Sequence, residues 1–200
     1  MPALLAHTYP TPLGDMLALF SPKGLCLLEF GVDTKGLARE WRDVVRHAGG
    51  AAEPGQDDRT RALGQELDAY FAGRLKRFTI PLDPVGTPFQ QQVWRALLEI
   101  PYGQTRSYGA QARSIGRPTA VRAVAAANGQ NKLAIIVPCH RVIGSDGSLT
   151  GYGGGVPMGG DLPPATATST TPRFLVSANM DNGTAEYPGN PLQRIQLIKG

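Results

Sequence analysis

The sequence has little cysteine, little charge and no long hydrophobic run. Two cysteines among 200 residues are too few for a disulfide scaffold and favour a reducing compartment. Charged residues make up only 18% of the chain, which argues against a coiled coil or a charged solenoid. No segment approaches the roughly 18 consecutive apolar residues of a membrane-spanning helix, so we expect no membrane association. The first 22 residues contain no Lys or Arg, the basic start of a signal peptide, and we therefore expect a cytoplasmic protein.

What the sequence does contain is enough apolar residues for a globular core. Hydrophobic residues make up 42% of the chain, which excludes wholesale disorder and fits one large domain or two small ones. The net charge of +4 is unevenly distributed: residues 1–86 carry 10 basic and 11 acidic side chains, whereas residues 87–155 carry 7 basic and 2 acidic ones. A basic segment of this kind attracts polyanions such as nucleic acid, and the alternative is an ordinary solvated basic surface.

The first part of the chain predicts a small α/β domain. Met16–Phe20 and Leu25–Phe30 are short apolar runs around turn residues, a pattern typical of a β-hairpin. Leu37–Ala48 and Thr60–Ala72 repeat apolar residues at helical spacing, and both predict helices. Phe78–Leu82 predicts a strand that closes this domain.

The middle part of the chain predicts three helices. Thr87 is a helix N-cap candidate, with Gln90 three residues later as in a capping box. Ser107 is suited to cap a second, short helix, and Thr119–Ala127 predicts an Ala-rich third helix. We expect this last helix to end in left-handed backbone at Asn128-Gly129. Two helices joined by a short Gly-containing turn form the helix-turn-helix pattern, although any pair of antiparallel helices produces a similar one.

A cysteine with polar neighbours follows an apolar run. Leu133–Val137 predicts a buried strand or extended segment that leads to Cys139, His140 and Arg141. A thiolate is a strong nucleophile that needs a nearby base or cation. A lone cysteine after such a run is more often structural. Because burying a Cys-His-Arg triplet is costly unless its polar groups have partners, the pattern nevertheless favours a site.

The motif Pro138-Cys139-His140-Arg141-Val142-Ile143 resembles the active-site signature of the O6-alkylguanine-DNA alkyltransferases, also called methylated-DNA–protein-cysteine methyltransferases. Asn131 stands eight residues before the cysteine, as it does in that family. The resemblance is strong over residues 86–155, loose over 1–85 and lost after 155. Further matching segments are Gly86–Gln90, Trp94, Ile100–Gly103, Ser107-Tyr108, Gly116–Pro118, Arg122–Val124 and Ala127-Asn128.

The resemblance implies DNA repair by direct, stoichiometric transfer of an alkyl (methyl) group from O6-alkylguanine in double-stranded DNA to Cys139. O4-alkylthymine stays open as a second substrate, and the family resemblance implies a monomer without a cofactor. The family flips the damaged base out of the duplex, with Arg122 filling the vacated stack and Tyr108 crowding the phosphate. His140 would deprotonate the thiol through a water, and Tyr152 would donate a hydrogen bond to the departing purine. The resemblance further assigns Asn131 to the catalytic group, Ser107, Arg117, Ala123 and Arg141 to DNA binding, and Pro138, Gly153 and Gly154 to the substrate pocket.

The resemblance ends at a segment rich in proline and glycine. The family continues into a Leu-rich helix ending in a glutamate that orients the histidine, whereas residues 156–164 here contain three prolines and two glycines. The 45 residues from 156 to 200 contain 6 Pro and 5 Gly and predict an irregular tail, foreign or disordered, with strand-like islands at 174–176 and 195–198. A sequence join near residue 156 is one explanation, and whether Asp161 or Glu186 replaces the glutamate stays open.

The expected fold class is α+β. A small N-terminal α/β domain (hairpin plus helices, residues 1–85) precedes a mostly helical DNA-binding and active-site domain with the helix-turn-helix (86–155), and an irregular C-terminal tail follows (156–200). Cys26, His7 and His47 do not reproduce the four-ligand zinc set that some family members carry, so we expect no metal. Two other functions are an alkylated-DNA-binding module with impaired or no transfer and, less favoured, a cysteine hydrolase.

Overall fold

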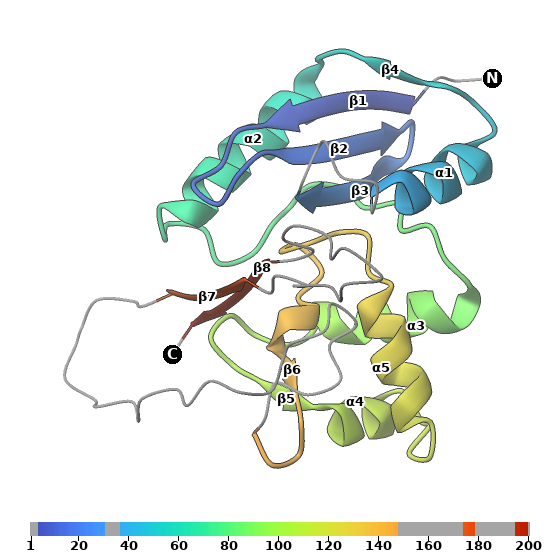
Figure 1. The fold of residues 1–200 in the computed structure, drawn as a ribbon, viewed down its shortest axis with the longest axis vertical. Coiled ribbons are helices and arrows are strands. Elements are labelled where there is room, and N and C mark those ends of the chain that lie inside the picture. The colour runs from blue at the N-terminus through green and yellow to red at the C-terminus, as the bar shows by residue number, and fades with distance from the viewer. Residues whose placement is uncertain (1–3, 31–36, 148–173, 179–194, 200) are drawn as a thin grey trace, which may run out of the picture. The chain divides into compact units, whose positions relative to one another are not determined.

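The computed structural model describes residues 4–30, 37–147, 174–178 and 195–199 of the 200-residue chain. The chain divides into two compact units (Figure 1), the first formed by residues 1–91 together with 131–137 and the second by residues 92–130 and 138–200. Residues 131–137 thus group with the N-terminal part of the chain, although they lie far from it in sequence.

The first unit is built on a four-stranded sheet of strand order β3-β2-β1-β4. β1 pairs antiparallel with β2 and β2 with β3, whereas β4 runs parallel to β1. The predicted hairpin is therefore confirmed as β2 and β3, while β1 and β4 had no prediction. The strands are β1 (Leu4–Tyr9), β2 (Met16–Ser21), β3 (Gly24–Phe30) and β4 (Ala52–Pro54).

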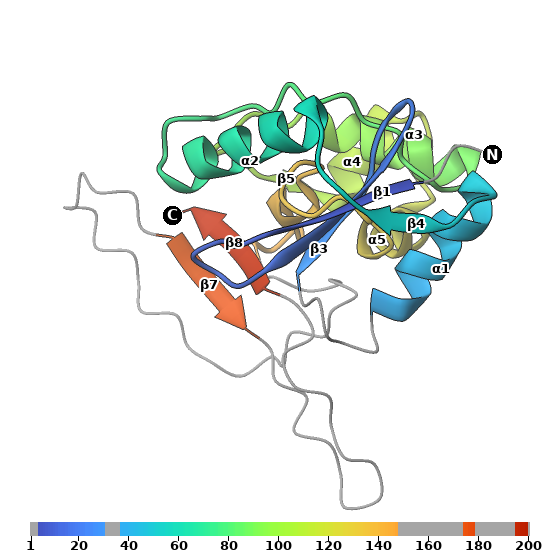
Figure 2. The ribbon, with the colours of Figure 1, turned by 90° about the horizontal axis from the view of Figure 1, so that it is seen from above.

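Two helices, α1 (Leu37–Ala48) and α2 (Asp58–Phe71), lie on opposite faces of this sheet (Figure 2), and both were predicted. Val44 of α1 belongs to a buried cluster with Leu19 and Leu27, which are paired across β2 and β3. The side chain of Tyr9, on β1, points to the opposite face of the sheet from this cluster. Its hydroxyl donates to the Thr60 carbonyl of α2 over 2.8 Å. The sheet is thus buried on both sides.

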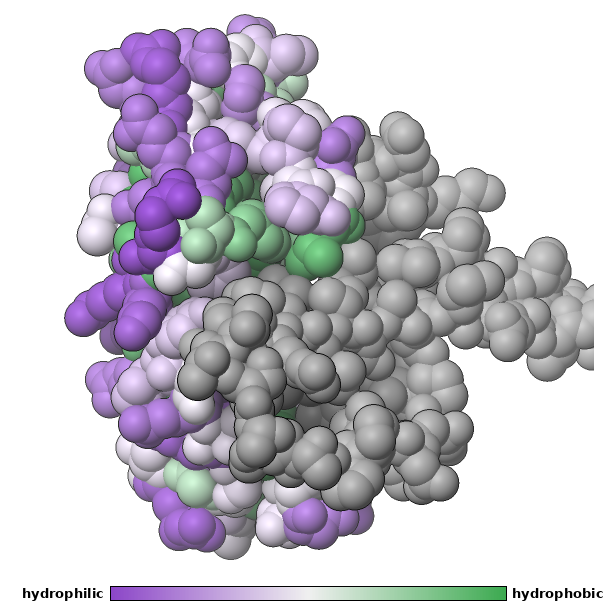
Figure 3. Space-filling view, turned by 90° about the vertical axis from the view of Figure 1, so that its left-hand side faces the viewer, coloured by the Kyte–Doolittle hydropathy of each residue, from purple (hydrophilic) through white to green (hydrophobic). Residues whose placement is uncertain are grey.

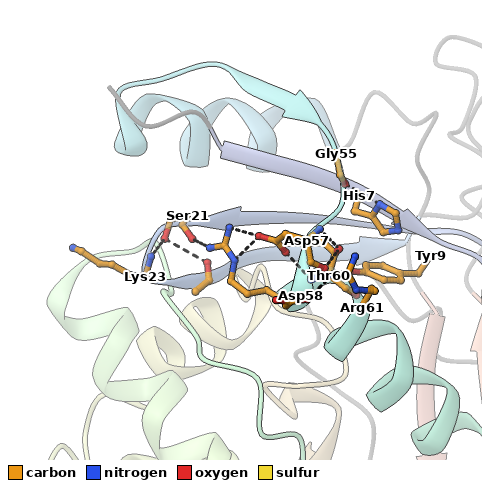
Figure 4. A network of polar contacts seen from close by, with 11 residues as sticks. His7, Tyr9, Ser21, Lys23, Gly55, Asp57, Asp58, Thr60 and Arg61 are labelled. Atoms are coloured by element: carbon orange, nitrogen blue, oxygen red, sulfur yellow. Dashed lines mark hydrogen bonds and ion pairs between the residues drawn. The ribbon is translucent and has the colours of Figure 1, made fainter.

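A polar network ties the N-terminus of α2 to the end of β2 (Figure 4). The Asp57 carboxylate accepts from the Thr60 N–H over 3.0 Å, and the Thr60 hydroxyl accepts from the Asp57 N–H over 2.9 Å, which completes a capping box. Arg59 pairs with Asp57 over 2.7 Å and donates to the Ser21 carbonyl over 2.5 Å. The Ser21 hydroxyl in turn donates to Asp83 over 2.6 Å, so the network also fixes the chain that leaves this unit.

Two predicted strands of this unit are wrong. In Phe78–Leu82 only Leu82 forms a bridge, to Leu25. Leu133–Val137 likewise forms one bridge, between Leu133 and Leu28, and otherwise consists of turns. Its β-branched residues favour a strand, but Ile135 has a φ of 69°, which takes the chain out of the extended conformation.

The second unit is mostly helical in its described part. Thr87 caps the first helix as predicted, since its hydroxyl accepts from the Gln90 N–H over 3.3 Å and the Gln90 side chain accepts from the Thr87 N–H over 2.7 Å. The indole N–H of Trp94 donates to the Ala127 carbonyl over 2.8 Å and joins the first helix to the last. The elements are α3 (Pro88–Leu98, whose first turn belongs to the first unit), β5 (Arg106–Ser107), α4 (Tyr108–Ser114), α5 (Val121–Gly129), the 3₁₀ helix η1 (Cys139–Arg141) and β6 (Val142–Ile143).

In the tail, β7 (Phe174–Ala178) and β8 (Ile195–Lys199) form an antiparallel pair at the two predicted strand-like islands.

No helix in the described ranges is long and apolar enough to cross a membrane. Hydrophilic residues predominate on the coloured part of the face in Figure 3, with hydrophobic residues in smaller areas. Among the described residues, the large apolar side chains that stay exposed are Leu98 and Val121.

Candidate active site and DNA-binding surface

Cys139 opens a tight turn that is anchored on both sides. It is the first residue of η1 and only 4% exposed. The Arg141 N–H donates to the Pro138 carbonyl over 3.0 Å and closes the turn. The next two residues form β6, which pairs parallel with β5. The turn is therefore tied through β6 to β5, which leads directly into α4, the first helix of the predicted helix-turn-helix.

His140 and Arg141 have different surroundings. Burial, and to a lesser extent the Arg141 guanidinium, lower the pKa of His140 to about 3. The imidazole is therefore neutral at physiological pH and has a lone pair that can accept a proton. The Arg141 guanidinium donates to the Ile100 carbonyl over 2.8 Å and stands 5.6 Å from the centroid of the Tyr102 ring. Both contacts fix the turn to the loop after α3, and DNA binding by Arg141 stays a prediction.

Tyr108 interacts electrostatically with Cys139, and its membership of one site with the cysteine stays a prediction. It is the first residue of α4 and is 7% exposed. Burial first, and then the charge of Cys139, raise the pKa of Tyr108 to about 12, so the phenol stays protonated and able to donate a hydrogen bond. Ser107 serves as the N-cap of this helix as predicted, because its hydroxyl accepts from the Ala110 N–H over 3.1 Å.

Asn131 binds the backbone of the segment that precedes Cys139. Its side-chain amide donates to the Val137 carbonyl over 2.9 Å and to the Leu133 carbonyl over 3.3 Å. The Leu133 N–H donates back to the Asn131 side-chain oxygen over 3.0 Å. These contacts are those of a residue that holds a turn, and a part of Asn131 in catalysis stays a prediction.

The two helices of the predicted helix-turn-helix are α4 and α5. Gly116 has a φ of 71° at the turn between them, where a Cβ would be strained, and the Arg117 N–H donates to the Ala112 carbonyl over 2.9 Å. On α5 the side chains of Arg122 and Ala123 are exposed. A long cation with small neighbours therefore reaches the surface, as a helix that enters a DNA groove requires.

One buried polar pair within these helices had no prediction. Gln111 and Asn128 exchange side-chain hydrogen bonds of 3.1 and 2.7 Å, and both residues are at most 1% exposed. Gln111 also donates to the Val93 carbonyl of α3 over 3.3 Å. The helix α5 continues through Asn128 to Gly129 and neither residue has a positive φ, so the predicted left-handed end is wrong. The available signal was a glutamine and an asparagine at positions of otherwise apolar helix faces.

Of the remaining predicted residues, some are described by the structure and others are not. Pro138 is buried directly before the cysteine. Cys26 is 1% exposed, its thiol donates to the Leu19 carbonyl over 3.2 Å, and burial raises its pKa to about 11, so it is a core residue. The described ranges contain no group of three or more His, Cys, Asp or Glu suited to a metal ion. Tyr152, Gly153 and Gly154 lie outside the described residues.

Comparisons with known families match most of the chain in two adjoining segments. The family described as "6-O-methylguanine DNA methyltransferase, ribonuclease-like domain" matches residues 4–84, and the corresponding DNA-binding domain matches residues 88–162. A third family, described only as a protein of unknown function, DUF3604, matches residues 141–200. The tail thus overlaps a family different from that of the rest of the chain.

Individual relatives carry the same name. The methylated-DNA–protein-cysteine methyltransferase of Methanosarcina barkeri is 45% identical over 148 residues, which is 73% of this chain and 86% of that protein. The Mycobacterium tuberculosis relative is 66% identical over 91 residues, 46% of this chain, and the match spans only 55% of that protein.

Solved structures agree with the sequence comparisons. The O6-methylguanine methyltransferase of M. tuberculosis superimposes with a TM-score of 0.62 at 45% identity, covering 78% of this chain and 86% of that one. A structure of the M. tuberculosis protein in complex with DNA gives 0.61 at 44% identity, covering 74% and 83%. The family and the α+β fold class inferred from the sequence are confirmed, and the chain belongs to the methylated-DNA–protein-cysteine methyltransferase family.

Proposed function

We propose that this chain repairs DNA by direct, stoichiometric transfer of the alkyl group of O6-alkylguanine to Cys139. The observation that carries the proposal is the position of Cys139 on a tight turn, beside a neutral His140 and close to Tyr108 at the start of the helix-turn-helix. Several relatives are named methyltransferases of this kind, and one of them has been solved with DNA. Double-stranded DNA is the proposed partner, the protein acts as a monomer, and O4-alkylthymine is an open second substrate.

The proposed chemistry is one displacement at the alkyl carbon. His140 accepts the thiol proton through a water, which leaves a thiolate as the nucleophile. The sulfur–carbon bond forms as the bond between the alkyl carbon and O6 breaks, and the electron pair leaves with guanine. Guanine takes up a proton as it departs, and Tyr108 and Tyr152 are the candidate donors. The product is a thioether that water does not cleave, so each chain acts once.

The proposed DNA contact is made by α5. Arg122 fills the space of the flipped nucleotide, and Ala123 permits close approach of the helix to the groove. Arg117, Ser107 and Arg141 are further proposed contacts, and Pro138, Gly153 and Gly154 surround the base. The positive charge of residues 87–155 supports affinity for the phosphate backbone and makes that affinity dependent on salt.

A labelled duplex tests the proposal. The chain is incubated with DNA carrying radiolabelled O6-methylguanine, and transfer of label to protein is followed to its plateau. We expect at most one methyl group per protein, carried by Cys139, and no transfer by Cys139→Ser. Repeated turnover, or label in the Cys139→Ser variant, would contradict the mechanism.

A second candidate function is a DNA-binding module with impaired transfer. It is favoured by the match of residues 141–200 to a family of unknown function and by the three prolines and two glycines of residues 156–164, a composition unfavourable to the Glu-terminated helix of the family. Loss of an orienting carboxylate leaves the imidazole less basic, so transfer slows by roughly 10²–10⁴-fold. Grafting a Leu-rich, Glu-terminated helix after Gly155 should then restore the rate. Equal rates with and without the graft would exclude this candidate.

A further inference from the structure

A short loop of the first unit carries three cations within four positions. Residues 74–77, the basic loop, follow α2 and contain Arg74, Lys76 and Arg77, whose side chains are all exposed. They are three of the 10 basic side chains of residues 1–86, a segment that also has 11 acidic side chains. The rest of that segment is therefore acidic overall, and its positive charge is concentrated at this loop.

The backbone of the basic loop is held by the end of α2. Gly73 has a φ of 73°, and its N–H donates to the Tyr70 carbonyl over 2.9 Å. The Arg74 N–H donates to the Ala69 carbonyl over 2.8 Å, and the Leu75 N–H shares this acceptor over 3.1 Å. The first two bonds form a Schellman motif, in which a left-handed glycine ends a helix. The basic loop thus begins at a fixed position relative to α2.

The far end of the basic loop is held by Glu66 of α2. The Glu66 carboxylate accepts from the Thr79 N–H over 3.0 Å, from the Ile80 N–H over 3.4 Å and from the Thr79 hydroxyl. The centroid of the Phe78 ring stands 5.1 Å from that of Tyr70, which is only 4% exposed. Both ends of the basic loop are therefore anchored to α2, and its exposed cations extend from a fixed backbone.

Protein groups do not neutralise these cations in the part of the chain that the structure describes. The ion pairs described in this unit are formed by other arginines, namely Arg46, Arg59 and Arg61. The Glu66 carboxylate binds backbone N–H groups instead of the cations. Like charges repel one another, and an exposed cluster of unneutralised cations is the electrostatic signature of a surface that binds a polyanion.

We propose that the basic loop binds the phosphate backbone of DNA, in addition to the contacts proposed for α4 and α5. Arg and Lys side chains neutralise phosphates and release counterions, and such contacts do not depend on the base sequence. DNA is favoured over other polyanions because a relative of this chain has been solved in complex with DNA. The inference rests on the DNA partner of the proposed function and not on alkyl transfer.

The salt dependence of DNA affinity tests this proposal. Binding of undamaged double-stranded DNA is measured between about 50 and 200 mM salt, in a Cys139→Ser background that removes the nucleophile. Arg74→Gln, Lys76→Gln and Arg77→Gln together should weaken binding about tenfold or more at the lowest salt. They should also reduce the slope of log affinity against log salt by about 2–3, since each phosphate contact contributes about 0.9.

The matched control removes the same charge from other exposed positions of the first unit, by Lys23→Gln, Arg42→Gln and Arg46→Gln. It should change the slope by less than about 0.5, because net charge alone makes no phosphate contact. Arg74→Lys with Arg77→Lys keeps the charge of the loop and should keep most of the slope.

An unchanged slope in the triple variant of the basic loop, or an equal fall in the control, would overturn the proposal. An unchanged slope with a lower free energy of unfolding would also overturn it, since the cations would then serve the dipole of α2. Absence of duplex binding by the unaltered chain would refute both this inference and the proposed function. The expected fall in slope, in a chain that transfers no methyl group, would refute the proposed transfer alone and support the basic loop as a DNA contact.

Discussion

The buried amide pair of Gln111 and Asn128 gives a stability prediction that the structure makes quantitative. Gln111→Leu deprives the Asn128 side chain of the acceptor for its N–H and of the donor to its oxygen. It also deprives the Val93 carbonyl of one donor. Both residues are at most 1% exposed, so water does not replace the lost partners. A buried polar group left without a partner costs about 1–3 kcal/mol, and two such groups on Asn128 should lower the free energy of unfolding by about 2–6 kcal/mol. Against a typical stability of about 5–15 kcal/mol this is a large loss.

The pairing itself is tested by a double-mutant cycle in urea. Gln111→Leu with Asn128→Leu removes both partners, so the double variant should lose less than the sum of the single variants, with a coupling energy of at least about 1.5 kcal/mol. Gln104→Leu changes an exposed glutamine and should shift stability by less than about 0.5 kcal/mol. Additivity of the two single variants within about 0.5 kcal/mol would show that the amides do not depend on each other.

Three further predictions concern DNA binding, pH and helix capping. Arg122→Ala should slow transfer from duplex DNA about 10–100-fold and from a short single strand much less, since only the duplex has a vacated stack to fill; equal losses on both substrates would remove this role. Because the pKa of His140 is about 3 in the folded chain and about 6.5 when unfolded, stability should be greatest above pH 6.5 and fall by up to about 1.4 kcal/mol per pH unit between these values, as measured by denaturation at several pH values. The transfer rate should correspondingly show no inflection near pH 6.5, and a step there would contradict a lowered pKa and a neutral imidazole at His140. Asp57→Ala should lower the free energy of unfolding by about 1 kcal/mol through loss of the cap of α2, whereas Asp57→Asn, which keeps an acceptor, should lose much less.

Features encoded by neighbouring residues were predictable from the sequence. The capping box of Thr87 and Gln90 and the cap at Ser107 depend on contacts three residues apart, and both are present. The Cys139 motif identified the family because its residues are adjacent. By contrast, the apolar run before the cysteine predicted a strand, since propensity takes no account of the tertiary contacts that hold Ile135 at a positive φ.

Features that join distant parts of the chain were not predictable. The Arg141 side chain donates to the Ile100 carbonyl, 41 residues away. Because every residue has a backbone carbonyl, the sequence does not identify Ile100 as an acceptor. Gln111 and Asn128 are 17 residues apart, and although each stands on an otherwise apolar helix face, neither position identifies the other as its partner. The partners of β1 depend in the same way on pairings that only the folded sheet defines.

The attachment of residues 131–137 to β3 has a consequence for how the protein can be divided. The family comparisons separate the chain at one point, between residues 84 and 88. The folded chain crosses between its two units three times, after residues 91, 130 and 137. A protease cut or a genetic exchange near residue 86 therefore cannot yield two complete modules, because the first loses its last segment and the second retains a segment whose hydrogen-bond partners have gone. Exchange of whole domains between relatives should succeed only when the residue at position 28 and the segment 131–137 come from the same parent.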